Sequence, residues 1–258
     1  MPKAMLETDN LTKDFGGLRA LDHVTIAVYQ GELLGLVGPN GAGKTTLLNS
    51  VVGICRPTNG RILLQEEDVT GLRPHRLAEK GLVKTFQLVT LFEESTVLEN
   101  MLVACHMRSK VGFWKSVFNT RDNRKKSGEM LNEALNALDL IGMTGSKDEV
   151  ARTLPYGHRK LLQLAMALTL SPKVLLLDEP AAGMNLDEIT SMMTLVKETQ
   201  RKGVGIILIE HNMRVIRDYC DKVVVLDYGQ KIAEGTPDEV SVNQNVIRAY
   251  LGEAERAT

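Results

Sequence analysis

A glycine-rich segment, residues 38–46, matches the spacing G-x-x-x-x-G-K-[ST] and lies between an apolar run, 33–37, and a helix-like run, 47–52. Glycines have no Cβ, so the backbone can curl until its N–H groups point at phosphate oxygens, and the positive end of the following helix adds to the attraction. Lys44 is expected to bind the β- and γ-phosphates, and the Thr45 hydroxyl to bind magnesium. The segment predicts a nucleotide phosphate site at Gly38, Pro39, Asn40, Gly41, Ala42, Gly43, Lys44, Thr45 and Thr46.

Two carboxylates, Asp178 and Glu179, directly follow the unbroken apolar run 174–177, which is typical of a strand buried on both faces. Carboxylates in such a place are costly unless they have partners. With the phosphate segment at the end of a parallel strand, Asp178 can hold the magnesium that bridges the β- and γ-oxygens. Glu179 can reach the water that attacks the γ-phosphate. Taken alone, the pair could equally be a surface pair.

Three further side chains suggest a function only in combination with the phosphate segment and the acidic pair. His211 follows the apolar run 205–209, so it can approach the γ-phosphate or the attacking water, although a lone histidine is more often a core or surface residue. Gln87 ends the strand-like run 81–87, where a glutamine is usually a surface residue. Phe15, beside two glycines, could stack on adenine or be an ordinary edge or core aromatic.

The elements that must position these residues follow an α/β pattern. Strand-like runs are followed by a helix-rich stretch, 97–172, after which strand-like runs alternate with helical ones. The alternation predicts a sheet with helices on its faces. The predicted strands are 5–8, 24–29, 33–37, 61–64, 81–87, 174–177, 205–209, 223–226 and 231–234, and the predicted helices are 73–80, 97–106, 129–140, 159–169, 186–202 and 213–219.

Composition bears on the partners and the cellular location that we expect for the protein. The 258 residues include 31 basic and 32 acidic ones, for a net charge of −1, which does not favour nucleic acid or an anionic membrane as a partner. The three cysteines are far apart and are expected to be reduced core thiols in a cytosolic protein. No apolar stretch approaches the ~20 residues of a membrane-spanning helix, so other chains must cross any membrane at which the protein works. The basic run 121–126 is interpreted as a solvated face, with contact to another subunit or to lipid headgroups as the alternative.

Taken in their order along the chain, these motifs resemble those of the ATP-binding subunit of ABC transporters, and the resemblance covers residues 5–252. The resemblance implies ATP and Mg2+ as cofactors. It implies adenine stacking on Phe15, catalytic roles for Lys44, Gln87, Glu179 and His211, and metal ligation by Thr45, Gln87 and Asp178. It also implies a single ABC ATPase domain, 1–258, of the α/β class. This would have a P-loop NTPase (RecA-like) core with an N-terminal antiparallel β subdomain (5–96 and 173–240), an inserted α-helical subdomain (97–172), and a C-terminal helix and tail (241–258).

Within that family, the segments 84–87, 91–92, 96–100, 179–185 and 247–253 resemble the branched-chain (hydrophobic) amino acid importers, and in particular the longer of their two ATPase subunits. The resemblance implies membrane permease subunits, a second ABC ATPase subunit (a paralogue or a second copy) and, indirectly, a solute-binding protein as partners. Nucleic acid is not expected. The expected location is the cytoplasmic face of the inner membrane, reached through the permease.

Three alternatives stay open. The chain could serve another transporter, for a different amino acid or amide or for lipopolysaccharide export. It could be a regulatory ABC subunit that binds ATP and hydrolyses it weakly. A soluble ABC protein of translation or DNA repair would normally have two cassettes or a long coiled coil, and the sequence has neither.

The family signature, normally Leu-Ser-Gly-Gly-Gln, reads Leu154-Pro155-Tyr156-Gly157-His158 here, before the predicted helix 159–169. By resemblance, Pro155, Tyr156, Gly157 and His158 would contact ATP held by the partner ATPase. Pro155 offers neither a hydroxyl nor an N–H, and a lost donor of the oxyanion-hole kind costs roughly 3 kcal/mol, or ~100-fold in rate. Asn185 also stands where aspartate is usual. The sequence thus predicts asymmetry: an intact site of its own and an altered contribution to the partner's site.

Overall fold

The computed structural model describes residues 3–85, 90–108 and 121–256. The chain divides into two compact units. The core unit comprises 1–84, 173–182 and 196–258, and the helical unit comprises 85–172 and 183–195.

The core unit contains a six-stranded sheet in the order β10-β9-β3-β8-β7-β6. Neighbouring strands are parallel except β10, which is antiparallel to β9. Every residue of β3 and β8 is buried, which explains their unbroken apolar sequences. The strands are β3 (Leu33–Val37), β6 (Leu82–Lys84), β7 (Val174–Asp178), β8 (Gly205–Ile209), β9 (Lys222–Asp227) and β10 (Gln230–Gly235).

A second, antiparallel sheet has the order β2-β1-β4-β5. Its strands are β1 (Ala4–Phe15), β2 (Leu18–Tyr29), β4 (Asn59–Leu64) and β5 (Glu67–Asp68). The first two are much longer than the predicted runs 5–8 and 24–29. The β1–β2 pairing shifts register at several places, for example between Thr8 and Leu11, and such irregularities break the strict alternation from which a strand is recognised.

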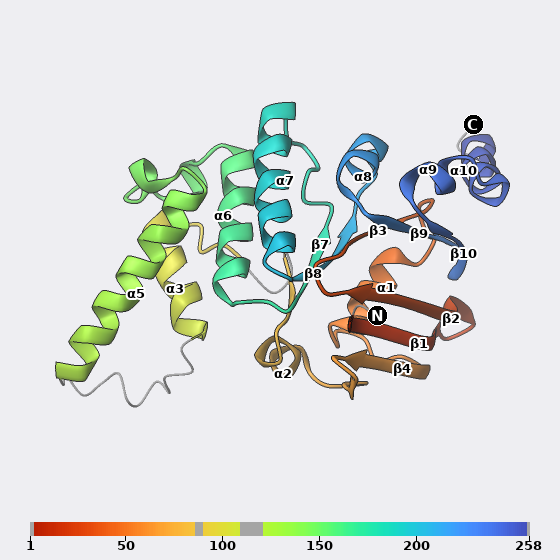
Figure 1. Cartoon of the computed structure of the whole chain (residues 1–258), viewed down its shortest axis with the longest axis horizontal. Coiled ribbons are helices and arrows are strands. Elements are labelled where there is room, and N and C mark those ends of the chain that lie inside the picture. The colour runs from red at the N-terminus through yellow and green to blue at the C-terminus, as the bar shows by residue number, and fades with distance from the viewer. Residues whose placement is uncertain (1–2, 86–89, 109–120, 257–258) are drawn as a thin grey trace. The chain divides into compact units, whose positions relative to one another are not determined.

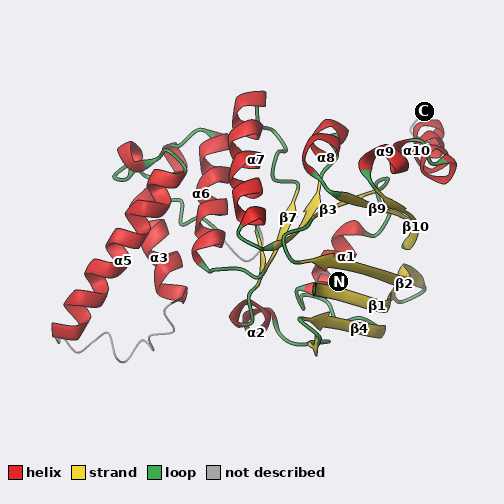
Figure 2. Ribbon diagram, in the orientation of Figure 1, coloured by secondary structure: helices red, strands yellow, loops and turns green. Residues whose placement is uncertain are grey.

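Helix α1 (Lys44–Val51) lies between the two sheets (Figures 1 and 2). Leu47 and Leu48 of this helix belong to one hydrophobic cluster with Leu6 and Ile26 of the antiparallel sheet and Leu36 of the parallel sheet. All of these side chains are at most 2% exposed. The same core therefore fixes both sheets and the helix that follows the glycine-rich segment.

The remaining helices of the core unit are α2 (Pro74–Glu79), α8 (Met213–Tyr219), α9 (Pro237–Ser241) and α10 (Gln244–Arg256). Helix α9 begins with a capping box in which Thr236 and Glu239 bond to each other's backbone N–H. Helix α7 (Leu186–Arg201) starts in the helical unit and ends in the core unit. Among the described residues, no helix combines the length and the apolar character needed to cross a bilayer.

The helical unit is built on α3 (Val97–Arg108), α5 (Arg121–Leu140) and α6 (Tyr156–Thr169), with short 3-10 turns at Thr144–Ser146 and Ala151–Thr153. Arg108 of α3 and Glu133 of α5 form an ion pair of 2.6 Å. One prediction is wrong here: α6 begins at Tyr156 rather than at Arg159, with Pro155 at the N-cap position. The basic run 121–126 belongs to helix α5.

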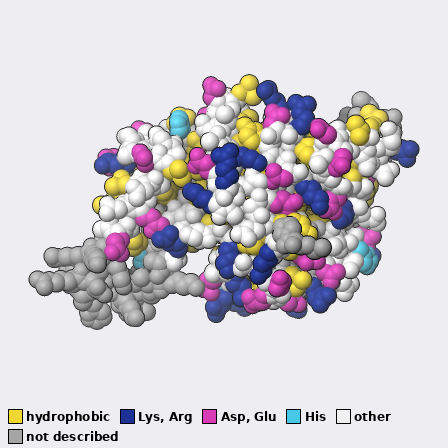
Figure 3. Space-filling view, viewed as in Figure 1, with side chains coloured by type: hydrophobic (Ala, Val, Ile, Leu, Met, Phe, Trp, Pro, Cys, Tyr) yellow, Lys and Arg dark blue, Asp and Glu magenta, His cyan; other side chains and the backbone are white. Residues whose placement is uncertain are grey.

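These elements confirm the predicted fold class: an α/β P-loop NTPase core with an antiparallel β subdomain and a helical subdomain. On the face shown in Figure 3, basic and acidic side chains of the described residues are interspersed, as the near-zero net charge of the sequence suggests.

Candidate functional site

The glycine-rich segment connects β3 to α1, and two of its glycines cannot be replaced without a clash. Gly38 has φ 148°, and a Cβ added there would lie 2.1 Å from the Leu226 carbonyl oxygen. Gly43 has φ 101°, and its Cβ would lie 2.7 Å from the Ala20 carbonyl oxygen. Left-handed backbone angles and close backbone approach both require glycine here. The loop is thus shaped by its contacts with β2 and β9.

Lys44, the first residue of α1, is only 7% exposed. Its ammonium group donates to the carbonyl oxygens of Gly38, at 2.7 Å, and Pro39, at 2.9 Å. The lysine is therefore held against its own loop. Thr45, Asn40 and Gly41 are exposed, so the loop presents a hydroxyl, an amide and part of its backbone to solvent.

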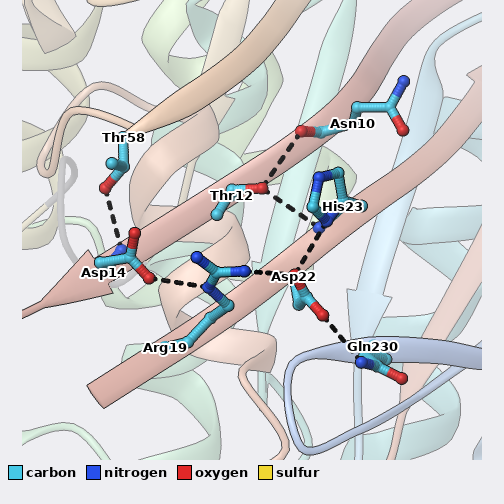
Figure 4. A network of polar contacts seen from close by, with 8 residues as sticks. All are labelled: Asn10, Thr12, Asp14, Arg19, Asp22, His23, Thr58 and Gln230. Atoms are coloured by element: carbon cyan, nitrogen blue, oxygen red, sulfur yellow. Dashed lines mark hydrogen bonds and ion pairs between the residues drawn. The ribbon is translucent and has the colours of Figure 1, made fainter. Parts of the chain in front are cut away.

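The loop rests on the turn between β9 and β10. Gly229 N–H donates to the Ala42 carbonyl at 3.0 Å, and Asp22 N–H donates to the Gly229 carbonyl at 2.8 Å. The Asp22 carboxylate in turn accepts from Arg19 and Gln230, as Figure 4 shows. The hydrogen bond with His23, followed by that from Gln230, lowers the pKa of Asp22. This network joins both sheets beneath the glycine-rich loop.

Phe15 lies at the end of β1, next to the turn that Gly16 and Gly17 make. Its ring is 49% exposed, and the Lys13 ammonium sits 4.7 Å from the ring centroid. About half of Phe15 is thus accessible to solvent, as stacking on adenine would require.

The acidic pair and the phosphate loop share one rim of the sheet. Leu36 of β3 pairs with Ile209 of β8, which pairs with Asp178 of β7, so the ends of these three strands are level. At this rim, His211 Nε2 lies 2.9 Å from Glu179 Oε1, and both side chains are about half exposed. Glu179 has a left-handed φ of 49°, a conformation that few non-glycine residues adopt. The structure thus brings together the two residues expected to act on water.

Asp178 has a partner that sequence reasoning missed. Lys84, the last residue of β6, places its ammonium group 3.0 Å from Asp178 Oδ2 and 3.1 Å from Asn49 Oδ1 of α1. The Lys84 side chain is completely buried. The only signal in the sequence was a lysine directly after the apolar residues Leu82 and Val83 of a predicted strand.

Glu210, immediately before His211, was also missed. Its carboxylate is buried, at 5% exposed, and accepts a 2.7 Å hydrogen bond from the backbone N–H of Ala181. Burial raises the pKa of Glu210, and the hydrogen bond from Ala181 only partly offsets that effect. The contact ties the turn after Glu179 to the turn that carries His211.

The altered signature forms the start of α6. Pro155 is the N-cap residue, in an extended conformation, and makes no side-chain cap. Tyr156 and His158 are exposed. Gly157 is buried against Glu188, whose carboxylate would lie 2.2 Å from a Cβ at this position. The glycine of the signature thus has a packing role within the helical unit.

Asn185 is the N-cap of α7. Its side chain accepts from the Glu188 N–H at 3.0 Å, and the Glu188 carboxylate accepts from the Asn185 N–H at 2.9 Å. This reciprocal pair is a capping box. Asparagine and aspartate are equally good N-caps, so the departure from aspartate leaves the start of the helix intact.

Gln87 lies outside the described residues. Asp178 and Thr45 offer a carboxylate and a hydroxyl oxygen, which are hard donors of the kind Mg2+ prefers. Across the described residues, no group of three or more His, Cys, Asp or Glu side chains could hold a metal ion. The available donors therefore fit an Mg2+ ion that takes its remaining ligands from phosphate oxygens and water.

Comparison with known proteins agrees with this geometry. The family model for "ABC transporter" matches residues 21–182. The chain belongs to the ABC transporter family. A second model, "Branched-chain amino acid ATP-binding cassette transporter", matches residues 230–256 of this ABC family member.

Individual relatives extend the match to nearly the whole length. The high-affinity branched-chain amino acid transport ATP-binding protein LivG of Escherichia coli (strain K12) is 40% identical to this chain. The alignment covers 98% of this chain and 100% of LivG. The high-affinity branched-chain amino acid transport ATP-binding protein BraF of Pseudomonas aeruginosa is 39% identical, and the alignment covers 98% of this chain and 100% of BraF. Among solved structures, the ADP conformation of an ATP-binding cassette of an ABC transporter has 33% sequence identity and a TM-score of 0.84 to this chain. The match covers 96% of this chain and 99% of that one. The resemblance to this family is confirmed.

Proposed function

We propose that this ABC family member is the ATP-binding and ATP-hydrolysing subunit of an importer for branched-chain or other hydrophobic amino acids. One observation carries the chemical part of the proposal. The level rim of β3, β8 and β7 brings Asp178 and the Glu179–His211 pair to the edge where the glycine-rich loop begins. Ligands of open α/β sheets bind at this edge.

ATP would be held by residues already shaped for it. The triphosphate would lie on the loop 38–46, and Lys44 would exchange its two carbonyl contacts for β- and γ-phosphate oxygens. Adenine would stack on the exposed face of Phe15. Asp178 and Thr45 would hold Mg2+, which when bound neutralises the charge of the phosphate oxygens.

Hydrolysis would use the Glu179–His211 pair. The Glu179 carboxylate accepts a proton from the attacking water, and His211, whose Nε2 lies 2.9 Å from Glu179 Oε1, holds that carboxylate in place. Gln87 is proposed to sense the γ-phosphate and to join the catalytic set.

A second ATPase subunit would close over the nucleotide. In this arrangement Pro155, Tyr156, Gly157 and His158 face the partner's ATP. Because Pro155 is an N-cap without a hydroxyl or an N–H, this contribution is weaker than that of a serine. The altered signature favours a paralogue over a second copy, since two copies would place the weakened loop at both sites.

The helical unit offers a surface for a permease segment. An apolar cavity of about 200 Å³ is lined by Phe92 and Met107, which are 55% and 60% exposed, and by Thr90, Val103, Ala104, Met166 and Leu170. An apolar side chain from a cytoplasmic helix of a permease fits this surface. The protein would then be peripheral at the cytoplasmic face of the membrane, and a solute-binding protein would act through the permease.

The substrate proposal is supported by the match of residues 230–256 and by the relatives LivG and BraF. It is tested by reconstituting the chain with its co-purifying permease, second ATPase subunit and solute-binding protein in proteoliposomes that contain ATP. We expect uptake of radiolabelled leucine, isoleucine and valine that depends on ATP and on this subunit. Uptake limited to other amino acids or amides, transport of lipopolysaccharide instead, or ATP binding without turnover would each contradict the proposal and indicate one of the alternatives.

A further inference from the structure

The carboxylate proposed to hold magnesium already has a cation beside it. Lys84 is the largest fully buried side chain of the described residues and is 0% exposed. Its ammonium group lies 3.0 Å from Asp178 Oδ2. Asp178 itself is 17% exposed, so the contact is largely shielded from water.

The surroundings fix this contact from two elements. β6 runs parallel to β7, with Lys84 paired to Leu176, so the lysine reaches the strand end that carries Asp178. The same ammonium donates to Asn49 Oδ1, at 3.1 Å, from α1, the helix that begins at Lys44. Lys84 thus links the phosphate-loop helix to the acidic strand end.

The charge of Lys84 affects how Asp178 can bind a metal ion. A buried ammonium group is tolerated only when it is paired, so Lys84 and Asp178 neutralise each other. A divalent cation that approached Asp178 alone would meet a neutralised carboxylate and a positive charge next to it. ATP phosphates would supply the negative charge and the oxygen ligands that overcome this repulsion.

We infer that Lys84 is a resident counter-ion of Asp178 that keeps Mg2+ from binding in the absence of nucleotide. The inference rests on the proposed function, because it takes Asp178 as a magnesium ligand. Lys84 is a positioning residue in this account and does not touch the reacting atoms.

The test measures thermal unfolding of the nucleotide-free protein in MgCl2, against NaCl of the same ionic strength. We expect no specific Mg2+ effect for the wild type or for Lys84→Arg, which keeps the charge. Lys84→Met leaves Asp178 without its counter-ion, so millimolar Mg2+ should raise its Tm by about 3 °C or more. The double variant Lys84→Met/Asp178→Asn should lose that rise, because the ligand is gone.

Two results would overturn the inference: a folded Lys84→Met protein that responds to Mg2+ no more than the wild type, or a double variant that keeps the response. If Lys84→Met fails to fold, Lys84→Gln, which retains a neutral donor, is read in the same way. Stabilisation of the wild type by ATP with Mg2+ tests the proposed function separately. If ATP with Mg2+ does not raise the Tm of the wild type, both the proposed function and the inference are overturned. If it does, but Mg2+ alone does not raise the Tm of Lys84→Met, only the inference is overturned.

Discussion

His211 Nε2 lies 2.9 Å from Glu179 Oε1, although the two residues come from turns after different strands. Glu179 is held there in a left-handed conformation, with its N–H bonded to the Ile209 carbonyl of β8. Backbone strain of this kind persists only where surrounding contacts enforce it. The surrounding backbone therefore holds Glu179 in the position from which it contacts His211.

Replacing His211 by alanine removes this contact and leaves the phosphate loop intact. Steady-state ATP hydrolysis by the assembled transporter should show kcat reduced about 100-fold, the low end for a group that assists proton transfer, with KM for ATP unchanged. A rise in KM at constant kcat would instead assign His211 to nucleotide binding.

Gly38→Ala should abolish nucleotide binding and destabilise the core unit by about 3 kcal/mol or more, because its Cβ would overlap the Leu226 carbonyl. Gly41→Ala is the matched control. A Cβ there meets nothing within 4 Å, so only the strain of its positive φ is added, about 1 kcal/mol. Chemical denaturation and binding of a fluorescent ATP analogue measure both effects. Equal losses in the two variants would show that the contact with β9 is unimportant.

Asn185→Ala should lower the stability of the helical unit by about 1 kcal/mol, since the N-cap acceptor for Glu188 N–H is lost. Asn185→Asp should keep the stability within about 0.5 kcal/mol of the wild type because aspartate caps equally well. Thermal unfolding compares the three proteins. If aspartate is as damaging as alanine, capping is not the role of this residue.

The buried Glu210 predicts a pH dependence of stability. Its pKa is raised by burial above the ordinary 4.5, so the native state binds its proton more tightly than the unfolded state does. The free energy of unfolding of the wild type should thus fall relative to Glu210→Gln as pH rises from about 4.5 through the raised pKa. Urea denaturation between pH 4.5 and 8 measures the difference. A gap that stays constant over this range would contradict the assignment.

The places of several candidate site residues in the fold were predictable because these residues follow short apolar runs typical of buried strands. Asp178 and His211 were placed correctly at strand ends from the runs 174–177 and 205–209, and the parallel sheet then brought them to one rim. Residues 38–46 were recognisable because phosphate binding demands glycine and lysine at fixed spacing.

What the sequence could not predict are contacts between side chains far apart in the chain. Lys84 looked like an ordinary strand residue, and only the pairing of β6 with β7 reveals its contact with Asp178. Glu210 faces Ala181 because two turns meet at the rim. The start of α6 was missed because the altered signature 154–158 was interpreted as a loop that precedes the helix. Pro155 instead occupies the N-cap position, and Gly157 lies inside the helix and packs against Glu188.

The central claim is that this subunit's own site hydrolyses ATP, with Glu179 acting on water. The most direct measurement is Mg-ATP hydrolysis by the assembled transporter in which Glu179→Gln is introduced into this subunit alone. We expect turnover to fall by about 100-fold or more while ATP binding is retained, because glutamine keeps the size of the side chain but cannot accept the proton. Unchanged turnover would contradict the claim and assign the chemistry to the partner's site.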